Sequence, residues 1–442
     1  MPDVAARSES SEAKSACETQ RSGARRTVVI GCGVIGLTTG LELLRRGEQV
    51  LLVDGAEQEG VGTSFANGGL LTPSMPDPWN APGIHRHLLE YLVSSSSALK
   101  VRLKALPSLA LWGPKFLLNS RQAPYQAATR ANFSLADYSL SVMRELRSEY
   151  DLAFDALDHG TLKIFRSEGA WAAALSVSQS LKPLGLVADP VETVALPRIE
   201  PCLTPIAGQL AGGIFYPSDG SGDAHIFCRA IARTIRNLGG SFRFGTPVRT
   251  IEVVDGQVRG IWVGKELVEA DGVVIATGVA SPALAARFGT KLAIKPVKGY
   301  SVTYDVGSAN CRPRVPVIDD AFHAAITPLG SRLRAAGTAE FAGHDLRLDR
   351  KRLDNLSLLF SEVYPELASA ATLATAKPWA GLRPVAADGL PYIGAAPVKG
   401  LWINSGHGHL GWTLAAGGAR MLVDLMAGVK PAIDAAPFAP SR

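Results

Sequence analysis

Apolar residues near the start of the chain follow the order of a strand, a helix and a second strand. The short apolar run at residues 28–30 predicts a buried parallel strand. Leu37, Leu41 and Leu44 recur at helical spacing, and the apolar residues 50–53 predict another buried strand. Together these segments predict a strand–helix–strand unit of about 30 residues, the kind of unit that builds a parallel sheet.

The turn between the first strand and the helix has the glycine spacing of a dinucleotide-binding motif. Gly31 allows a tight turn, Gly33 lets the backbone approach a pyrophosphate, and Gly36 lets the helix pack closely on the strand. The pyrophosphate would lie at the helix N-terminus, where free N–H groups and the helix dipole favour an anion. Asp54 follows the second strand and would accept hydrogen bonds from an adenosine ribose, which disfavours NADP. The unit predicts dinucleotide binding but does not by itself decide between FAD and NAD.

Two stretches after this unit have an unusual composition. Residues 60–83 are rich in Gly, Ser, Asn and Pro, and residues 63–69 offer small side chains, hydroxyl groups and backbone donors to a flavin or phosphate; a plain solvent loop is the alternative. Residues 85–130 interleave basic residues with leucines and aromatic residues, and Glu90 is their only acid. Helices of this kind lie either on an anionic membrane surface or against the protein with snorkelling Lys and Arg side chains.

The pattern of a nucleotide-binding fold returns only after a long interval. A buried strand at residues 272–276 delivers Thr277 and Gly278 at its C-terminal end, more than 200 residues after the first unit. Small residues at that place let a cofactor pass close to the backbone. An interrupted nucleotide-binding fold with an inserted domain therefore explains the order better than a contiguous NAD domain. The other predicted helices are residues 132–150, 169–186, 224–238, 351–364 and 366–376, and the other predicted strands are residues 160–165, 241–244, 248–253, 258–263, 266–270, 294–304, 315–318, 323–327 and 332–337.

A second strand, turn and helix lie near the end of the chain. A strand at residues 401–404 leads through a glycine- and histidine-rich turn at residues 405–413 into a small-residue helix at residues 414–427. No second ribose-binding acid follows, so we do not expect a second dinucleotide site there. The helix N-terminus could instead stabilise negative charge on the pyrimidine edge of a reduced flavin.

Composition restricts the class of protein. A chain of 442 residues exceeds the usual size of one core, so two domains are expected, and 47% apolar with 19% charged residues is typical of a globular protein. A net charge of +5 gives no indication of nucleic-acid binding. Five scattered cysteines without a C-x-x-C or zinc spacing indicate reduced thiols in a cytosolic compartment.

Signals for targeting, membrane insertion and metal binding are weak. Residues 1–25 lack the apolar segment of a secretory signal and are expected to be a disordered tail. No run of about 18 apolar residues is present, which argues against a membrane span. The His-x-His pairs at residues 85–87 and 407–409 have no third ligand nearby in the sequence, so no metal site is expected.

Several stretches of the chain resemble the FAD-dependent D-amino acid dehydrogenase small-subunit family, which lies within the broader group of glycine, sarcosine and D-amino acid oxidases. They run in the expected order from Thr27 to about Pro431. Their length and their content of Gly, Trp and His make chance a poor explanation. The matching stretches are VVIGCGVIGLTTGLELLRRG, TSFANGG followed by PWNAPG, GGIFYPSDGSGD, FRFGTPV, KPVKGYSVT, WAGLRPVAADGLPYIG and LWINSGHGHLGWTLAAGGARMLVDLMAG.

The resemblance implies an α/β fold, in which an interrupted Rossmann-like FAD-binding domain carries an inserted α+β substrate domain built on a mainly antiparallel sheet. After the tail at residues 1–25, the FAD-binding domain is expected at residues 26–84, 201–285 and 379–442, and the substrate domain at residues 85–200 and 286–378.

The resemblance also implies that FAD is the cofactor. Non-covalent binding is expected, because no cysteine lies between Ala371 and Arg442, unlike in the relatives that attach flavin covalently. The residues expected to contact FAD are Val28, Val29, Ile30, Gly31, Cys32, Gly33, Val34, Ile35, Gly36, Asp54, Ser64, Ala66, Asn67, Gly68, Val248, Thr277, Gly278, Gly406, His407, Gly408, Leu410, Gly411 and Thr413.

Three residues are expected to act on the substrate. Arg383 would anchor the substrate carboxylate through a bidentate pair, the geometry that a guanidinium supplies best. Tyr300 would line the substrate pocket, and the helix that starts after His409 would stabilise the anionic reduced flavin. His407 or His409 could assist the chemistry or be structural. A surface position for Arg383 and a core position for Tyr300 are the alternatives.

The implied reaction is the oxidative deamination of a D-amino acid to a 2-oxo acid and ammonia, with hydride transfer from Cα to flavin N5. Electrons would pass to a quinone or another carrier, and residues 85–130 could provide a peripheral contact with the inner face of the cell membrane. The alternatives are a flavin oxidase that uses oxygen on glycine, sarcosine or hydroxy-D-proline, a non-catalytic FAD subunit, and an NAD(P)-linked dehydrogenase. The sequence does not name the preferred amino acid, the electron acceptor or the oligomeric state.

Overall fold

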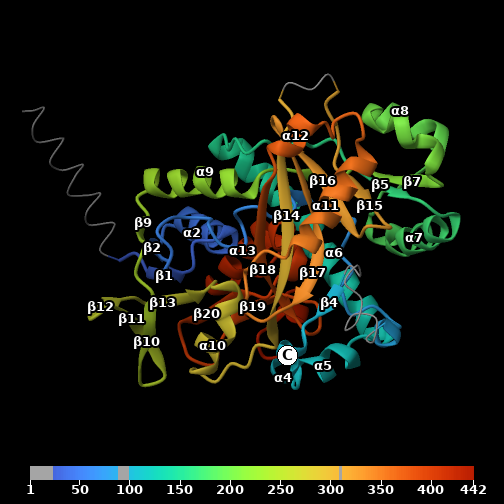
Figure 1. Ribbon diagram of the computed structural model, residues 1–442. Coiled ribbons are helices and arrows are strands. Elements are labelled where there is room, and N and C mark those ends of the chain that lie inside the picture. Colours follow the sequence, from blue (N-terminus) through green and yellow to red (C-terminus); the bar gives the residue numbers. More distant parts are fainter. Residues whose placement is uncertain (1–22, 88–98, 308–310) are drawn as a thin grey trace, which may run out of the picture.

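The computed structural model describes residues 23–87, 99–307 and 311–442, which form two large sheets with helices packed against both (Figure 1). All but the last three residues of the expected tail, and residues 88–98 of the basic and apolar stretch, lie outside these ranges. Within the described ranges, no helix is long and apolar enough to cross a membrane.

Strand β1 lies inside a six-stranded sheet, as the predicted dinucleotide-binding unit requires. It pairs in parallel with β2 on one side and β13 on the other, and only the edge strand β19 runs antiparallel to its neighbour. Central parallel strands are buried on both faces, which explains their almost wholly apolar sequences. From edge to edge the strands are β19 (Tyr392–Ala395), β20 (Leu401–Ser405), β13 (Gly272–Ile275), β1 (Arg26–Ile30), β2 (Gln49–Val53) and β9 (Ser241–Arg243).

Each face of this sheet is covered by a different layer (Figure 1). Val29 of β1 packs into a core shared with helices, whereas its neighbour Val28 packs into a core shared with a three-stranded sheet. The pleat of a strand imposes this alternation. The helical layer contains α2 (Val34–Arg45), α6 (Gln122–Tyr150), α9 (Ala224–Asn237) and α13 (Gly411–Met426), and the small sheet contains β10 (Val248–Val254), β11 (Gln257–Val263) and β12 (Glu266–Glu269).

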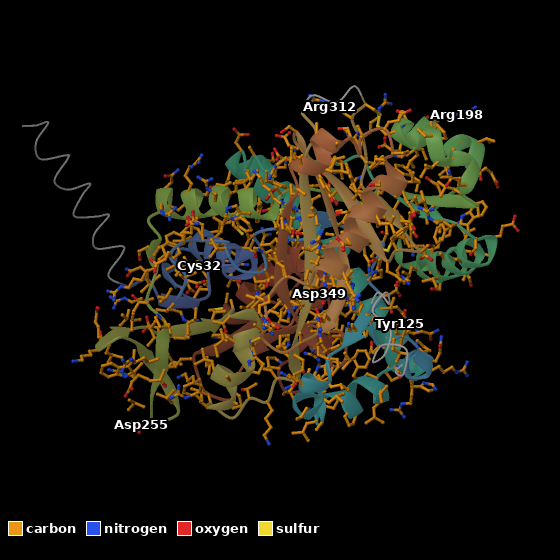
Figure 2. The ribbon with its side chains drawn as sticks, viewed as in Figure 1. Cys32, Tyr125, Arg198, Asp255, Arg312 and Asp349 are labelled. Carbon is orange, nitrogen blue, oxygen red and sulfur yellow. A yellow bond between two sulfur atoms is a disulfide. The ribbon has the colours of Figure 1, made fainter. Side chains whose placement is uncertain are left out.

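The turn between β10 and β11 has the conformation that its sequence favours. Asp255 and Gly256 have φ angles of 49° and 74°, and the residues on either side of them are paired. Two successive residues with positive φ are typical of the tight hairpin turn that Asp-Gly adopts. Figure 2 shows Asp255 at the outer edge of the molecule, as expected for a hairpin tip.

The second large sheet is mainly antiparallel, and only its β15–β5 and β17–β4 pairs are parallel. One face is covered by α11 (Arg350–Val363). Tyr300, Val302 and Tyr304 pack on this side as their alternation predicts, and Tyr304 stacks on Phe360 with a centroid distance of 4.3 Å. The strand order is β18 (Lys377–Ala386), β14 (Ile294–Asp305), β17 (Arg332–Phe341), β16 (Ala324–Leu329), β15 (Val317–Asp319), β5 (Thr161–Phe165), β7 (Gly212–Tyr216) and β6 (Asp189–Val191), with β4 (Leu99–Val101) added beside β17.

Shorter elements connect these layers. The short strands are β3 (Leu70–Leu71) and β8 (Gly220–Ser221), and the short α-helices are α4 (Leu106–Leu109), α5 (Trp112–Leu118), α8 (Leu196–Ile199), α10 (Ser281–Ala286) and α12 (Ala370–Ala374). A longer helix, α7 (Glu168–Leu181), packs against β5 and β7. The 3-10 turns are η1 (Ile84–His87), η2 (Leu103–Ala105), η3 (Lys182–Leu184), η4 (Thr193–Ala195), η5 (Pro201–Gln209), η6 (Gly278–Ala280), η7 (Gly408–Leu410) and η8 (Ala436–Phe438).

The expected fold class is confirmed: the chain is α/β, with a nucleotide-binding sheet and a second, mainly antiparallel sheet. The domain boundaries stay a prediction. Strands β7 and β18 both belong to the second sheet, although the sequence assigns their residues to FAD-binding segments. The predicted helix at residues 132–150 is the C-terminal part of α6, and the predicted helix at residues 366–376 is reduced to α12.

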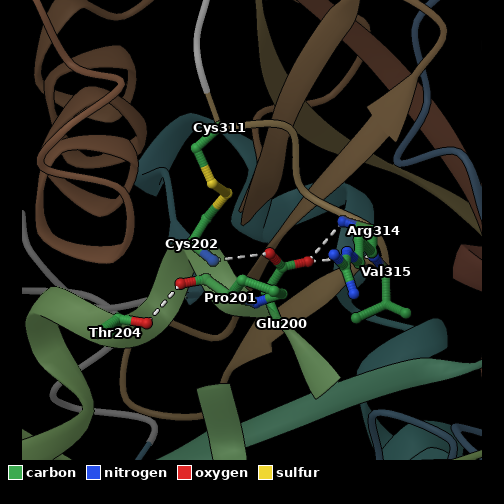
Figure 3. Close-up of a disulfide and its surroundings, with 7 residues drawn as sticks. All are labelled: Glu200, Pro201, Cys202, Thr204, Cys311, Arg314 and Val315. Carbon is green, nitrogen blue, oxygen red and sulfur yellow. Dashed lines mark hydrogen bonds between the residues drawn. A yellow bond between two sulfur atoms is a disulfide. The ribbon is translucent and has the colours of Figure 1, made fainter. Parts of the chain in front are cut away.

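The expectation that all five cysteines are reduced is wrong. Cys202 in η5 forms a disulfide with Cys311, which is 109 residues away in the sequence (Figure 3). Folding brings their Cα atoms to 6.1 Å, a distance that sequence spacing cannot reveal. Cys32 and Cys228 are free and buried, and Cys17 lies outside the described residues.

We expect this disulfide to contribute to the stability of the fold. Closing a loop of about 100 residues restricts the unfolded chain, so a Cys202→Ser/Cys311→Ser variant should lose about 2–4 kcal/mol of unfolding free energy. Urea unfolding of the wild type with and without reductant measures the same difference. The double variant is the matched control, because reductant should not shift its midpoint. An unchanged wild-type midpoint in reductant would contradict the prediction.

Candidate active site

A deep cavity of about 1950 Å³ runs from the glycine turn after β1 to the second sheet. Ordinary small-molecule pockets have volumes of roughly 300–1,000 Å³, so this cavity suits a ligand of dinucleotide size. Cys32 lines it at one end and Tyr125 of α6 at the other, and both residues are labelled in Figure 2.

The nucleotide end of the cavity is shaped by three glycines with different roles. A Cβ on Gly31, whose φ is +110°, would lie 2.5 Å from the carbonyl oxygen of Ala276. A Cβ on Gly36 would lie 1.8 Å from the carbonyl oxygen of Gly31, so only glycine lets α2 approach the turn this closely. On the Cβ side of Gly33, the nearest atom is the Ser64 Oγ at 3.5 Å. The backbone at Gly33 is therefore open to a phosphate.

The N-terminus of α2 faces this opening. The N-cap residue of α2 is Gly33, which has no side chain to cap the helix. The amide of Val34 donates a hydrogen bond to the Ser64 Oγ at 3.0 Å. The Asp54 carboxylate accepts bonds from the amides of Cys32 at 2.6 Å and Ala56 at 2.9 Å, which hold it at the edge of the cavity. Gly33 and the helix N-terminus fit a pyrophosphate, and the position of Asp54 fits a ribose.

A second helix begins at the same cavity. The turn before α13 is made possible by Gly406 and Gly408, whose φ angles are +85° and +57°. The first residues of α13 carry no side-chain cap, so the amides at its start are available to a ligand. Burial lowers the pKa of His407 to about 3 and that of His409 to about 4, so both imidazoles are neutral at neutral pH.

Trp79 forms the wall between this turn and the second sheet. Its ring stacks on His409 with a centroid distance of 5.2 Å and an interplanar angle of 13°. The Arg383 guanidinium lies 5.6 Å from the centroid of the same ring. An aromatic ring against a cation adds a modest attraction and also holds the guanidinium in one direction.

Arg383 on β18 is a cation without a counter-ion in the described part of the chain. Arg383 Nη1 donates a hydrogen bond to the carbonyl oxygen of Thr338, at 2.8 Å. Burial lowers the pKa of Arg383 to about 10, which still leaves the guanidinium charged at neutral pH. A buried cation is costly unless it is paired, so this group is suited to an incoming carboxylate.

The backbone around Arg383 has an unusual geometry. Thr338 has a φ of +58°, which is rare for a β-branched residue, and the pairing of β14 with β17 shifts register beside it. This bulge turns the Thr338 carbonyl towards Arg383. Opposite, a Cβ on Gly299 would lie 2.2 Å from Arg383 Nη1, so glycine leaves the room that the guanidinium occupies.

Tyr300 borders the cavity, but its hydroxyl group is engaged elsewhere. The hydroxyl donates to the Glu340 carboxylate at 2.6 Å, within the core beneath α11. Burial and this neighbouring carboxylate raise the pKa of Tyr300 well above its usual value. The Tyr300 hydroxyl is therefore not available to donate a hydrogen bond to a substrate.

The chain matches known proteins over nearly its whole length. The family model described as FAD dependent oxidoreductase matches residues 26–425. D-amino acid dehydrogenases from Cereibacter sphaeroides and Paramagnetospirillum magneticum are 38% and 37% identical over 415 and 414 residues, covering 93% and 92% of this chain and 94% and 96% of theirs. The chain belongs to the FAD-dependent oxidoreductase family.

Solved structures show the same fold at lower identity. Glycine oxidase from Geobacillus kaustophilus has a TM-score of 0.72 at 23% identity, covering 95% of this chain and 99% of its own. L-proline dehydrogenase from P. horikoshii has a TM-score of 0.74 at 18% identity, covering 95% and 97%. At these identities the likeness concerns the fold alone.

Most residues of this oxidoreductase that the sequence assigns to FAD line the cavity. Three do not: Val28 and Val29 lie in the hydrophobic cores, and Gly36 packs against Gly31, so they support the turn rather than face a ligand. Those that do line it are Ile30, Gly31, Cys32, Gly33, Val34, Ile35, Asp54, Ser64, Ala66, Asn67, Gly68, Val248, Thr277, Gly278, Gly406, His407, Gly408, Leu410, Gly411 and Thr413.

Three residues around Arg383 were not predicted from the sequence as site residues: Trp79, Gly299 and Thr338. Trp79 could have been found, because a tryptophan in a Pro- and Gly-rich loop is unusual. Gly299 and Thr338 gave no signal of their own, because their roles depend on strand pairing across the second sheet.

We expect Gly36→Ala to weaken FAD binding by about tenfold or more. The added methyl group meets the Gly31 carbonyl and must push α2 away from the turn that would hold the pyrophosphate. The ratio of flavin to protein after desalting, and the Kd from flavin fluorescence, measure the effect. Gly169→Ala in the first turn of α7 is the matched control, because its Cβ meets open space. Unchanged FAD affinity in Gly36→Ala would contradict the prediction.

Proposed function

We propose that this FAD-dependent oxidoreductase is a D-amino acid dehydrogenase that converts D-amino acids to 2-oxo acids and ammonia. The observation that carries the proposal is the Arg383 guanidinium, which has no counter-ion among the described residues and lies in the cavity that begins at the dinucleotide-binding turn. The names of the relatives, which are 37–38% identical over more than nine-tenths of the chain, support the choice of substrate.

The chain would bind and orient the substrate as follows. Arg383 would hold the substrate carboxylate, with the Thr338 carbonyl and the Trp79 ring fixing the direction of the guanidinium. The Gly31–Gly33 turn and α2 would hold the FAD pyrophosphate, and the start of α13 would stabilise negative charge on the flavin ring. When bound, FAD supplies the hydride acceptor at its N5 atom. Catalysis by the protein is then mostly positioning and electrostatics.

The two histidines would shape the wall of the cavity as neutral side chains and would not act as cationic acids. Their lowered pKa values keep His407 and His409 neutral, and His409 is committed to the stack with Trp79. No side-chain base is needed if the substrate amine binds in its neutral form, because its lone pair is then available to form the C=N bond as the hydride leaves Cα. The imino acid would then hydrolyse to the 2-oxo acid and ammonia.

Non-covalent FAD is part of the proposal. Cys32 lines the cavity, but burial and the nearby Asp54 carboxylate raise its pKa well above that of a free thiol. A protonated, buried thiol is a poor nucleophile for attachment to a flavin. Acid precipitation should therefore release the flavin into the supernatant.

A peripheral membrane contact through the stretch at residues 85–130 is supported by its described part. Leu111 is 87% exposed and Leu103 71% exposed, and Lys104 and Lys115 lie exposed beside them. Trp112 and Phe116 turn inward, so these short helices pack on the protein and present leucines outward. Exposed leucines among basic residues suit an anionic lipid surface, where a membrane quinone could accept the electrons.

Anaerobic flavin bleaching tests the proposed function. D-amino acids should bleach the flavin absorbance, whereas L-amino acids, glycine and sarcosine should do so poorly. Reduced enzyme should then reoxidise faster with a soluble quinone than with air. Fast reoxidation by air would favour the oxidase alternative, and bleaching by no amino acid would favour a non-catalytic FAD subunit.

Arg383→Ala should raise the KM for a D-amino acid by about tenfold or more, a loss of about 1.4 kcal/mol. The reason is that the substrate carboxylate loses its only partner cation near Trp79. Arg347→Ala is the control, because Arg347 is an exposed residue paired with Asp345 away from the cavity. Steady-state kinetics with a quinone acceptor measure both variants. Unchanged kinetics in Arg383→Ala would remove Arg383 from the site.

Leu111→Glu should reduce binding to vesicles that contain phosphatidylglycerol by about tenfold, since burying one leucine is worth about 1.5–3 kcal/mol. Co-sedimentation with vesicles measures the change. Leu346→Glu is the control, because Leu346 is 52% exposed but lies outside the stretch. Failure of the wild type to sediment with these vesicles would contradict the membrane contact.

A further inference from the structure

The cavity extends past Trp79 along residues 74–80, of which Ser74, Met75, Asp77, Pro78 and Trp79 line it. The even-numbered residues are buried and the odd-numbered residues are half-buried, as in a strand whose successive side chains point to opposite sides. The half-buried residues Met75, Asp77 and Trp79 all line the cavity.

Hydrogen bonds fix the buried side of this segment. Ser74 donates from both its amide and its hydroxyl to the Asp219 carboxylate, at 3.2 and 2.5 Å. The Pro76 carbonyl accepts a bond from Asn132 Nδ2 of α6 at 3.0 Å. Because the segment cannot rotate without breaking these bonds, Asp77 keeps its orientation towards the cavity.

Asp77 lies close to the place where Arg383 would hold a substrate carboxylate. The Cα atoms of Asp77 and Trp79 can be at most about 7 Å apart, because two residues of extended chain span no more. Trp79 in turn contacts Arg383 and His409. Asp77 and Arg383 therefore lie near the same tryptophan in one cavity.

The Asp77 carboxylate forms no salt bridge within the described ranges. Tyr125 of α6, labelled in Figure 2, donates a hydrogen bond to Asp77 Oδ1 at 3.0 Å. Lys163 also lines this part of the cavity, but its ammonium group pairs with Asp320 at 2.6 Å. Burial raises the pKa of Asp77, while the hydrogen bond from Tyr125 and the positive charge of Lys163 act to lower it.

The other walls near Asp77 are apolar or already satisfied. Ser178 and Tyr216 are hydrogen-bonded to each other at 3.0 Å, and Val177, Leu181 and Ile318 supply apolar surface. Among the described residues, this part of the cavity therefore combines room for a methylene chain with one carboxylate that forms no ion pair.

We propose that Asp77 and Tyr125 form a subsite for the side chain of the substrate, and that it selects D-amino acids with a cationic side chain, an amine or a guanidinium. This inference rests on the proposed function. A cation would complete the pairing that Asp77 lacks, a neutral side chain would leave the carboxylate unpaired, and an anionic side chain would be repelled.

Selectivity between matched substrates tests the subsite. We expect a higher kcat/KM for D-lysine than for D-norleucine or D-glutamate. Asp77→Asn should lower the ratio of kcat/KM for D-lysine to that for D-norleucine by about tenfold or more. Asp189→Asn, an equal charge change at an exposed position away from the cavity, should leave the ratio unchanged. A wild-type preference for D-norleucine or D-glutamate, or a ratio unaffected by Asp77→Asn, would overturn the subsite.

A binding measurement separates the subsite from the proposed reaction. 6-Aminohexanoate carries a carboxylate and a distal ammonium but no α-amine, and hexanoate lacks the ammonium. The shift of the flavin absorbance on binding should give a Kd for 6-aminohexanoate about tenfold below that for hexanoate, and Asp77→Asn should abolish the difference. If this holds while no D-amino acid bleaches the flavin, the subsite stands and the proposed function falls. If D-amino acids bleach the flavin but the two Kd values agree, the subsite falls alone.

Tyr125→Phe keeps the test decisive if Asp77→Asn does not fold with FAD bound. Removing the hydroxyl leaves the ring in place, so we expect a change in the D-lysine to D-norleucine ratio of about threefold, smaller than for Asp77→Asn. Equal effects of Tyr125→Phe on the two substrates would contradict the subsite.

Discussion

The packing of α13 against α2 is the contact on which the rest of the site depends, because both helices begin at the cavity. The Thr38 hydroxyl of α2 lies 3.3 Å from the carbonyl oxygen of Ala415 in α13, and Arg420 of α13 pairs with the buried Glu42 of α2 at 2.5 Å. On its other side, α13 meets α6 so closely that a Cβ on Gly417 would lie within 2.7 Å of that helix. Small residues along α13 therefore let two helix N-termini converge on one ligand, which joins the dinucleotide-binding turn to the glycine- and histidine-rich turn.

The two faces of the second sheet differ in how their buried charges are paired. Beneath α11, the buried Glu340 meets Arg102, Lys298 and the Tyr300 hydroxyl, so its charge is offset within the protein. On the cavity side, Arg383 has a backbone carbonyl for a partner. A charge left unpaired costs stability, and a ligand of opposite charge can recover that cost. The cavity face can therefore bind a ligand of opposite charge, whereas the ion pairs beneath α11 help to hold the sheet together.

Local patterns predicted much of the fold because the relevant interactions lie close together in the sequence. The glycine turn after β1 works through residues within one strand–helix unit, and the turn at residues 255–256 needs only its own two conformations. The alternation along β14 also identified which side chains pack beneath α11. Cys202 and Cys311 show the opposite case, because nothing in their spacing indicates that folding brings them together.

The sequence by itself determined the nucleotide-binding unit, the alternation that builds the two sheets, and the types of residue available to the site. The tertiary structure decided which of them meet. Arg383 lies in the cavity without a counter-ion among the described residues because a bulge in β17, on the far side of β14, turned the Thr338 carbonyl towards it and Gly299 left it room. The same pairing directed Tyr300 away from the substrate side, onto Glu340. These outcomes depend on a β-bulge and on contacts between segments far apart in the chain, and the local pattern of apolar and polar residues did not locate either.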